Sequence, residues 1–346
     1  MDLMDHGFTC EKTKNSDMTA SVSKVTLSGH KSGIISLFEI GKGNVLLSSS
    51  DDGTVRVWDT RCKNTSVRLI RIPGSEGNVG FVKRNESLAV VSRGNKLFGY
   101  DLRADSSVIV GKPLFSFEST PIDEDINDFE LSSETIAVPI DDGSVKLIST
   151  KSFTEIAQSV GSHENIAAVA RFLPSGDRIV SGGYDCKVSV SKLENNVLRE
   201  EKNFVLASLL PPDEDDGETG SQSINPPFVT SMEVCGGAER NQIAVGSGDG
   251  SVVVFDLHRG GSKLDTRRIA WGGTRVHGTS VSGISWSDDN ESVWSVGNDS
   301  VLLLMDQVRL RVRYDLGLKP NTVVSMGAHR VAVGGLRSEI EILEFR

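Results

Sequence analysis

Short turn motifs recur along the whole chain at nearly constant spacing, and this repetition limits the folds that the chain can adopt. In most of them a run of small residues leads to Asp-Gly, Asp or Asn and then to alternating apolar residues, the pattern of a tight turn between two strands. The turns lie at Asp52-Gly53, Asn95, Asp142-Gly143, Asp185, Asp249-Gly250, Asp299 and, more weakly, Arg337-Ser338. Successive turns are separated by 43, 47, 43, 64, 50 and 39 residues. Seven repeats of one β unit therefore fill the chain.

The repeats predict an all-β fold in which seven units close into a ring. A unit of this length cannot bury its own sheet faces, so we expect the seven to stack radially around a central channel as the blades of a β-propeller. The segment EIEILEF from Glu339 is expected to form an inner strand of the seventh blade. SKVTL, from Ser23 to Leu27, is expected to pair as the outermost strand of that blade, which closes the ring and hides two strand edges.

The same spacing divides the chain into a tail, one domain and an inserted loop. We expect residues 1–20 to be a disordered tail and residues 21–346 to form the propeller. The longest interval between successive turns, from Asp185 to Asp249, contains PPDEDDGETGSQSINPP, residues 211–227. This segment is acidic and rich in Gly, Ser and Pro. A segment of this composition cannot bury a core, so it is expected to be a loop inserted between blades four and five.

The first repeat carries a Gly-His opening, Gly29-His30, and a Trp-Asp close, Trp58-Asp59, with His30 and Trp58 28 residues apart. This pattern resembles the WD-repeat family, over nearly the full length of the chain and most strongly in blade one. The resemblance implies a structural hydrogen-bonded tetrad of His30, Ser48, Asp52 and Trp58. The other blades have different residues near the place of Trp58 and are expected to rely on packing: Tyr100, Ile148, Ser191, Phe255 and Met305. His163 and His277 lie near the Gly-His position of blades four and six, whose turns are supplied by Asp185 and Asp299. We interpret the two histidines as loop residues whose hydrogen bonds are made within the blade, rather than as metal ligands or catalytic bases.

Composition excludes several classes of function. The formal net charge of −10 argues against broad nucleic-acid binding, because the phosphate backbone favours a basic surface. The four cysteines, Cys10, Cys62, Cys186 and Cys235, have neither metal-ligand spacing nor a disulfide pattern. No signal peptide or membrane span is evident, so a cytoplasmic or nuclear location is expected. We predict no cofactor.

No motif of a known catalytic chemistry is present in the sequence. It contains no GxSxG, no GxxxxGK[ST] and no HExxH, and its acidic pairs fall at strand turns, where Asp is favoured for backbone hydrogen bonding. The chain is therefore predicted to be a non-catalytic protein-protein interaction module.

The end of blade one suggests where a partner docks. Trp58-Asp59-Thr60-Arg61, preceded by Ser48-Ser49-Ser50 and Asp52, looks like the DWD box. This resemblance implies docking on damaged-DNA-binding protein one, the adaptor of cullin-four ubiquitin ligases. Blade two has a partial copy, so the candidate docking residues are Asp59, Arg61, Asp101 and Arg103. The alternative is that these arginines only solvate a loop, as Lys or Arg does in many WD repeats.

A second candidate surface is the channel mouth. Residues just before the turn Asp of each blade are expected to point there, which gives Asp51, Asp141, Tyr184 and Asn298. Together with the acidic run from Asp213 to Asp216, this mouth would attract a basic peptide, although acidic loops often serve only solubility.

These features together predict a substrate receptor of a cullin-four ligase, monomeric outside its complex. The degenerate blades, the acidic loop and the size also look like the small WD-repeat group that includes WD-repeat-containing protein fifty-three, which favours the same role. The alternative is a constitutive scaffold component of another assembly, in ribosome biogenesis, chromatin or trafficking.

Overall fold

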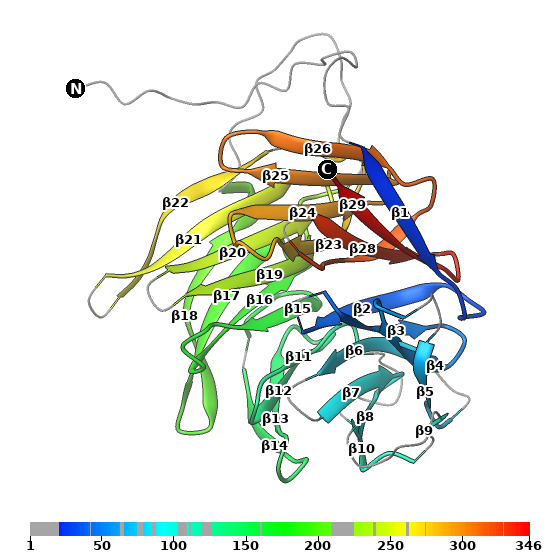
Figure 1. The fold of residues 1–346 in the computed structure, drawn as a ribbon. Coiled ribbons are helices and arrows are strands. Elements are labelled where there is room, and N and C mark those ends of the chain that lie inside the picture. Colours follow the sequence, from blue (N-terminus) through cyan, green and yellow to red (C-terminus); the bar gives the residue numbers. More distant parts are fainter. Residues whose placement is uncertain are drawn as a thin grey trace.

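The chain folds into seven β-sheets arranged around a common axis, and their strands are antiparallel except for one short parallel pairing (Figure 1). The computed structural model describes residues 21–41, 43–62, 66–74, 79–84, 88–102, 109–110, 112–118, 126–159, 161–208, 225–237, 240–260, 263–273, 275–327 and 329–346. The predicted tail, residues 1–20, lies outside these residues, as does most of the predicted insertion at 211–227.

Each sheet is one blade, numbered in chain order. Blade 1 contains β2 (Ile34–Ile40), β3 (Val45–Ser50), β4 (Thr54–Asp59) and β5 (Ser66–Arg71), with β9 (Ile109–Val110) paired in parallel to β5. Blade 2 contains β6 (Val79–Arg84), β7 (Leu88–Arg93), β8 (Lys96–Asp101) and β10 (Phe115–Glu118). Blade 3 contains β11 (Glu130–Leu131), β12 (Thr135–Pro139), β13 (Val145–Ser149) and β14 (Glu155–Gln158). Blade 4 contains β15 (Ala167–Phe172), β16 (Arg178–Gly183), β17 (Lys187–Glu194) and β18 (Val197–Val205), followed by the 3₁₀ helix η1 (Leu206–Ser208).

The remaining blades have the same plan. Blade 5 contains β19 (Val229–Gly237), β20 (Arg240–Ser247), β21 (Val252–Gly260) and β22 (Lys263–Gly273). Blade 6 contains β23 (Val281–Trp286), β24 (Ser292–Gly297), β25 (Val301–Asp306) and β26 (Leu310–Asp315). Blade 7 contains β27 (Pro320–Ser325), β28 (Arg330–Gly335), β29 (Ile340–Phe345) and the N-terminal strand β1 (Val22–Leu27).

The ring is closed by the pairing of β1 with β29, as the sequence predicted. β1 runs antiparallel to β29, from Val22 opposite Phe345 to Leu27 opposite Ile340, and completes the last blade from the other end of the chain (Figure 1). The first strand of each blade contacts the first strand of the next, so β2, β6, β11, β15, β19, β23 and β27 form the innermost ring. The prediction of a seven-bladed propeller is confirmed.

The repeated turn Asp has a local physical cause. In blade 1 the carboxylate of Asp52 accepts a hydrogen bond from the backbone N–H of Thr54 at 3.0 Å, two residues later. Between them Gly53 has a φ of +82°, which L side chains rarely adopt. The same hydrogen bond of 2.9–3.2 Å recurs in four other blades, at Asp142, Asp185, Asp249 and Asp299. An Asp that bonds its own backbone two residues on therefore sets the register of these hairpins.

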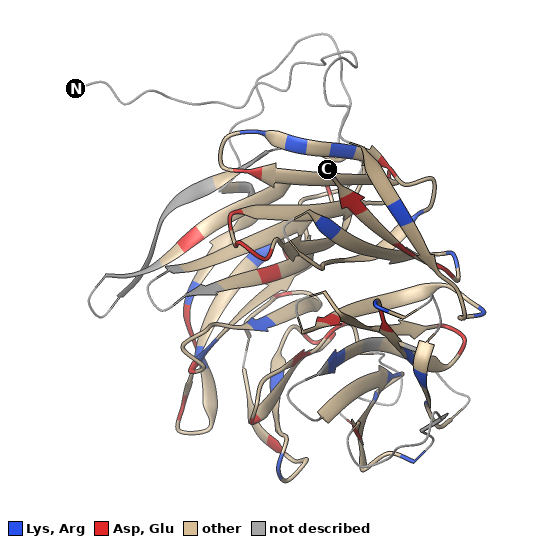
Figure 2. Cartoon of the chain, in the orientation of Figure 1, with Lys and Arg blue, Asp and Glu red and all other residues tan. Residues whose placement is uncertain are grey.

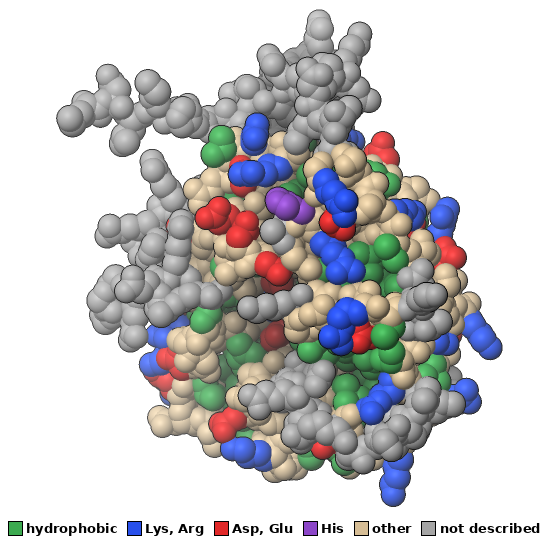
Figure 3. Space-filling model, viewed as in Figure 1, with side chains coloured by type: hydrophobic (Ala, Val, Ile, Leu, Met, Phe, Trp, Pro, Cys, Tyr) green, Lys and Arg blue, Asp and Glu red, His purple; other side chains and the backbone are tan. Residues whose placement is uncertain are grey.

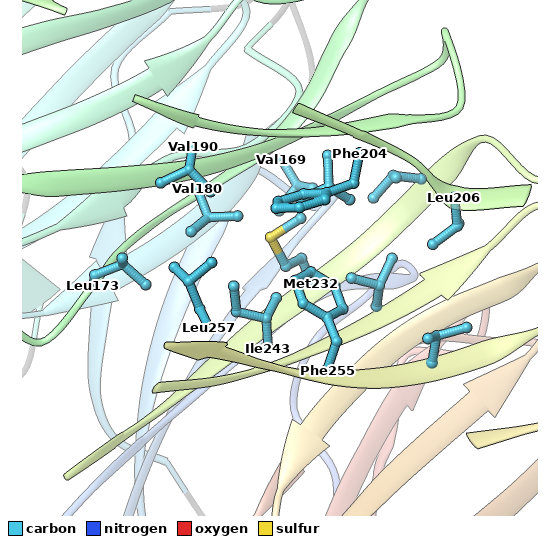
Figure 4. Packing of buried hydrophobic residues seen from close by; sticks show 14 residues of the cluster. Val169, Leu173, Val180, Val190, Phe204, Leu206, Met232, Ile243, Phe255 and Leu257 are labelled. Atoms are coloured by element: carbon cyan, nitrogen blue, oxygen red, sulfur yellow. The ribbon is translucent and has the colours of Figure 1, made fainter. Parts of the chain in front are cut away.

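Apolar side chains fill the spaces between neighbouring blades. The largest cluster lies between blades 4 and 5, where Figure 4 shows Met232 between Phe204 and Phe255. The centroids of the two rings are 5.9 Å apart. Both faces of each blade are thereby covered, which explains why many strands are nearly continuous apolar runs.

Antiparallel strands give the propeller two different faces. The turn between the second and third strands of a blade lies at the same end as the entry to its first strand, which we call the turn face. The loops between first and second strands and between third and fourth strands lie at the other end, which we call the loop face. In blade 1 the two loops of the loop face are joined by a 2.9 Å hydrogen bond from the Thr60 N–H to the Asn44 carbonyl.

Candidate protein-interaction site

The four tetrad residues of blade 1 form one chain of hydrogen bonds. The indole Nε1 of Trp58 on β4 donates to the Ser48 Oγ on β3 at 2.8 Å, and the His30 Nε2 lies 2.7 Å from the same Oγ. On the other side of the ring, the His30 Nδ1 lies 3.0 Å from the Asp52 Oδ2. All four side chains are buried or nearly so. The tetrad links the entry of blade 1 to its third strand and its turn, and its position inside the blade makes it structural.

Asp52 is the charged end of this chain. Burial alone would raise the pKa of its carboxyl, but hydrogen bonds from His30, from the Thr54 hydroxyl and from the Lys31 backbone outweigh it and hold the pKa far below its usual range. In blade 6 the pKa of Asp299 is lowered in the same way, against burial, chiefly by the hydrogen bond from His277. Both carboxylates therefore favour the folded state only while they are ionised.

We expect an acid-sensitive stability that depends on Asp52. A carboxyl whose pKa is lower in the folded state stabilises the protein above its unfolded pKa, about 3.9, and this contribution is lost as pH falls through the folded pKa. Urea unfolding at pH 6 and pH 3 should show a smaller loss of stability on acidification in Asp52→Asn than in the wild type.

The neighbouring Asp51 supplies the control for this experiment. Burial and the charge of Asp52 raise the pKa of Asp51, so its contribution to the pH dependence has the opposite sign. Asp51→Asn should steepen the loss of stability on acidification. An unchanged profile in Asp52→Asn would contradict the role given to that carboxylate.

Blades 4 and 6 correct the expectation that all blades other than the first rely on packing. In blade 4 the His163 ring lies 3.0 Å from Asp185 and 2.9 Å from the Ser181 Oγ. In blade 6 the corresponding distances from His277 are 3.1 Å to Asp299 and 2.9 Å to Ser295. Both blades thus keep three of the four tetrad members, without the tryptophan.

The two serines were not predicted, although the sequence contains a signal for them. Ser48, Ser181 and Ser295 each lie four residues before the turn Asp of their blade. The residues at the Trp58 position are buried in all these blades, including Ser191 and Met305. In blades 2, 3 and 5 packing does replace the tryptophan, through Tyr100, Ile148 and Phe255, which are at most 1% exposed.

Asp59 and Arg61 form a surface ion pair on the loop face. The Arg61 Nε and Nη2 donate to the two carboxylate oxygens of Asp59 at 2.9 and 2.7 Å, and the Arg61 backbone N–H donates to Oδ1 at 3.0 Å. The Arg61 side chain is 67% exposed. Hydrogen bonds from the guanidinium and backbone of Arg61 lower the pKa of Asp59 to about 2. The Asp59 carboxylate therefore orients the Arg61 guanidinium, and the remaining N–H groups of the guanidinium stay available for a partner.

The equivalent positions in blade 2 are described only in part. Asp101 ends β8, in the place that Asp59 has in β4, and Leu102 after it is buried. Arg103 lies outside the described residues. Among the described residues, Asp59 and Arg61 are thus the complete candidate pair, and they lie on the loop face.

Three of the four channel-mouth residues occupy equivalent places on the turn face. The backbone N–H groups of Asp51, Tyr184 and Asn298 donate to the carbonyls that immediately precede the innermost strands β2, β15 and β23, at 3.1, 2.9 and 2.9 Å. All three are exposed, and the Tyr184 ring lies 4.9 Å from that of Phe228. Asp141 is half-buried and accepts a hydrogen bond from Asn127. These positions are therefore on the face opposite Arg61.

A charge network on the innermost strands was not anticipated from the sequence. Arg171 on β15 contacts Asp128, which precedes β11, and its Nε lies 3.5 Å from the Glu130 Oε2. Lys83 on β6 lies 3.3 Å from the same Glu130 oxygen. Glu233 on β19 accepts a hydrogen bond from the backbone N–H of Trp286 at 2.9 Å. Burial raises the pKa of Glu233, and this effect outweighs the lowering by that hydrogen bond. Charged side chains of blades 2, 3 and 4 are thus linked on the innermost strands, and Glu233 links blade 5 to the backbone of blade 6.

The described part of the chain contains no cluster of three or more His, Cys, Asp or Glu residues able to hold a metal ion. Within the same residues no helix is long and apolar enough to cross a membrane. Lys, Arg, Asp and Glu are interspersed along the strands, and on the face in Figure 3 hydrophobic side chains form small groups between them (Figures 2 and 3). The arrangement provides exposed polar surfaces at both ends of a rigid ring.

Comparison with known proteins agrees with this architecture. The family described as WD domain, G-beta repeat matches residues 21–59 and 154–190, which include the tetrad of blade 1 and the triad of blade 4. The chain is a seven-bladed β-propeller that contains WD repeats at these positions. The crystal structure of the WD40 β-propeller domain of Doa1 superposes with a TM-score of 0.70 and covers 94% of this chain and 97% of that chain, at 16% identity. This likeness shows the fold, and Arg61 is an exposed position on it.

The curated proteins that are similar in sequence include the following two. WD repeat-containing protein 53 homolog from Dictyostelium discoideum is 24% identical over 248 residues, 68% of this chain and 66% of that protein. A component of chromatin assembly factor 1 from Gallus gallus is 22% identical over 186 residues, 52% of this chain and 30% of that protein. The propeller therefore spans just under two thirds of the first relative and less than a third of the second.

Proposed function

We propose that this propeller is a substrate receptor that docks through the loop face of blade 1 on the damaged-DNA-binding protein one adaptor of a cullin-four ubiquitin ligase. The observation that carries the proposal is the Asp59–Arg61 pair, with its exposed and oriented guanidinium. The similarity to WD repeat-containing protein 53 homolog supports the proposal to the extent that this relative is also a WD-repeat protein. Ubiquitin transfer would belong to the partners.

The two-faced geometry supports the receptor role. An adaptor bound at Arg61 on the loop face leaves the turn face open, where Asp51, Tyr184 and Asn298 are exposed. A receptor needs two such surfaces, because adaptor and substrate must bind at the same time. A planar guanidinium held by a carboxylate loses little entropy when it makes a further bidentate contact.

Arg61→Ala is expected to weaken binding to the purified adaptor at least tenfold, because the oriented guanidinium is removed. Arg346→Ala is the matched control. Arg346 is 68% exposed and pairs with Glu344, two residues before it, as Arg61 pairs with Asp59. Surface plasmon resonance with folded variants should show the loss only for Arg61→Ala. Equal affinity of the wild type and Arg61→Ala, or no binding of the wild type, would refute the docking role.

A constitutive scaffold component is the second candidate, and the similarity to the chromatin assembly factor 1 component favours it. A scaffold should co-fractionate with one large complex at fixed stoichiometry, whereas a receptor should be sub-stoichiometric and exchange with other receptors. Quantitative affinity purification distinguishes the two. If the protein is a scaffold, Arg61→Ala leaves the set of co-purifying proteins unchanged.

A further inference from the structure

A hollow of about 600 Å³ opens at the turn face of blade 1. It lies between the entry to β2, the turn from β3 to β4, the end of β5 and the end of β7 in blade 2. Its lining is formed by Lys31, Asp52, Gly53, Thr54, Arg56, Leu69, Arg71, Ile72, Gly74 and Arg93. We call it the blade 1 pocket.

The blade 1 pocket concentrates positive charge in a protein of net charge −10. Four of its lining residues are cationic: Lys31, Arg56, Arg71 and Arg93. Lys31 and Arg71 are exposed, whereas Arg56 and Arg93 are partly buried. Three of the four carry a planar guanidinium, the group best suited to bidentate contacts with phosphate. The local charge is thus opposite in sign to that of the whole chain.

The one anion in the lining is already satisfied. Asp52 accepts hydrogen bonds from the backbone N–H groups of Lys31 and Thr54 at 2.9 and 3.0 Å, and it contacts His30 and the Thr54 hydroxyl. Its charge is therefore directed into the blade. The other lining residues include no acid, so the lining as a whole remains positive.

Arg56 shows that hydrogen-bonding capacity remains inside the pocket. Its Nη1 donates to the Ser66 Oγ at 2.8 Å, and its guanidinium lies 6.0 Å from the Trp58 ring centroid. Its Nε is buried and has no hydrogen-bond partner in the described part of the chain. Because this Nε is inaccessible, an oxyanion in the pocket would instead meet the partly exposed end of the Arg56 guanidinium.

We propose that the blade 1 pocket binds a phosphorylated side chain of a partner protein. The guanidinium and ammonium groups would bind the phosphate, and Leu69 and Ile72 in the same lining would contact the flanking aliphatic residues. A protein segment fits better than a nucleic acid, because the cations occupy one compact pocket rather than an extended basic path. This site is on the face opposite Arg61 and does not depend on docking to the adaptor.

The test uses the isolated protein and a fluorescent degenerate peptide library with a fixed central phosphoserine. Two further libraries carry serine or glutamate at that position. Fluorescence polarisation should show saturable binding of the phosphoserine library and competition by excess inorganic phosphate. Lys31→Glu/Arg71→Glu should weaken this binding at least tenfold, because both residues are exposed and their substitution reverses the charge of the pocket.

Arg313→Glu/Lys319→Glu is the control, since it makes the same change in net charge at exposed positions of other blades. It should bind the phosphoserine library within twofold of the wild type. Absent binding, or equal loss in both double variants, would overturn the site. Equally tight binding of the glutamate library would overturn its assignment to phosphate. Because no adaptor is present, failure of the docking proposal cannot produce any of these outcomes.

Discussion

Trp58→Ala is expected to lower the free energy of unfolding by about 3–5 kcal/mol, the usual cost of truncating a buried aromatic side chain. Trp58 is 1% exposed and packs in the cluster that joins blades 7 and 1 around the ring closure. The substitution leaves a cavity in the cluster that includes Leu27 of the closing strand β1, and it removes the donor to Ser48. Urea unfolding followed by circular dichroism measures the loss.

A second tryptophan separates the hydrogen bond from the packing. Trp294 in blade 6 is fully buried, but its Nε1–H has no hydrogen-bond partner among the described residues. Trp58→Phe and Trp294→Phe both remove ring volume, but only Trp58→Phe removes a hydrogen bond that exists in the folded protein. We expect Trp58→Phe to be the more destabilising of the two by about 1 kcal/mol. Equal losses would mean that the tetrad contributes packing alone.

The repeated turns were sufficient to predict the propeller because their cause is local. The Asp accepts a hydrogen bond from the N–H two residues later and is often followed by a Gly at positive φ, so the turn can be recognised from a few consecutive residues. The closing strand was also predictable, because β1 is a short segment with β-branched residues that lies before the first repeat. The triads of blades 4 and 6 were missed for a different reason. Ser181 and Ser295 lie as many residues before their turn Asp as Ser48 does. Because these blades lack the tryptophan, the serine position can be recognised only when the blades are aligned with one another.

The candidate sites were less predictable because they depend on contacts between repeats. Arg61 was found from its own motif, but its bidentate pairing with Asp59 is a property of the folded loop. The blade 1 pocket assembles cations from the entry of blade 1, from β4 and β5, and from Arg93 of blade 2. No spacing in the sequence joins these positions. The network around Arg171 likewise draws its members from different blades.

Arg171→Met should destabilise the protein by about 3–5 kcal/mol, because it leaves buried carboxylates without their cation. The Arg171 side chain is 16% exposed, and that of Asp128 is 6% exposed. The attraction of Asp128 and Glu130 outweighs burial and raises the pKa of Arg171, which keeps it charged. Methionine preserves much of the volume, so the loss reports charge rather than a cavity.

Two further variants make this prediction specific. Arg171→Met/Asp128→Asn should recover part of the stability at pH 7. Arg178→Met is the control in the same blade, because its partners Asp177 and Glu201 are 43% and 28% exposed and stay hydrated when the arginine is lost. A deficit equal to that of Arg178→Met would show that Arg171 acts through packing and that the innermost strands are held together without this charge network.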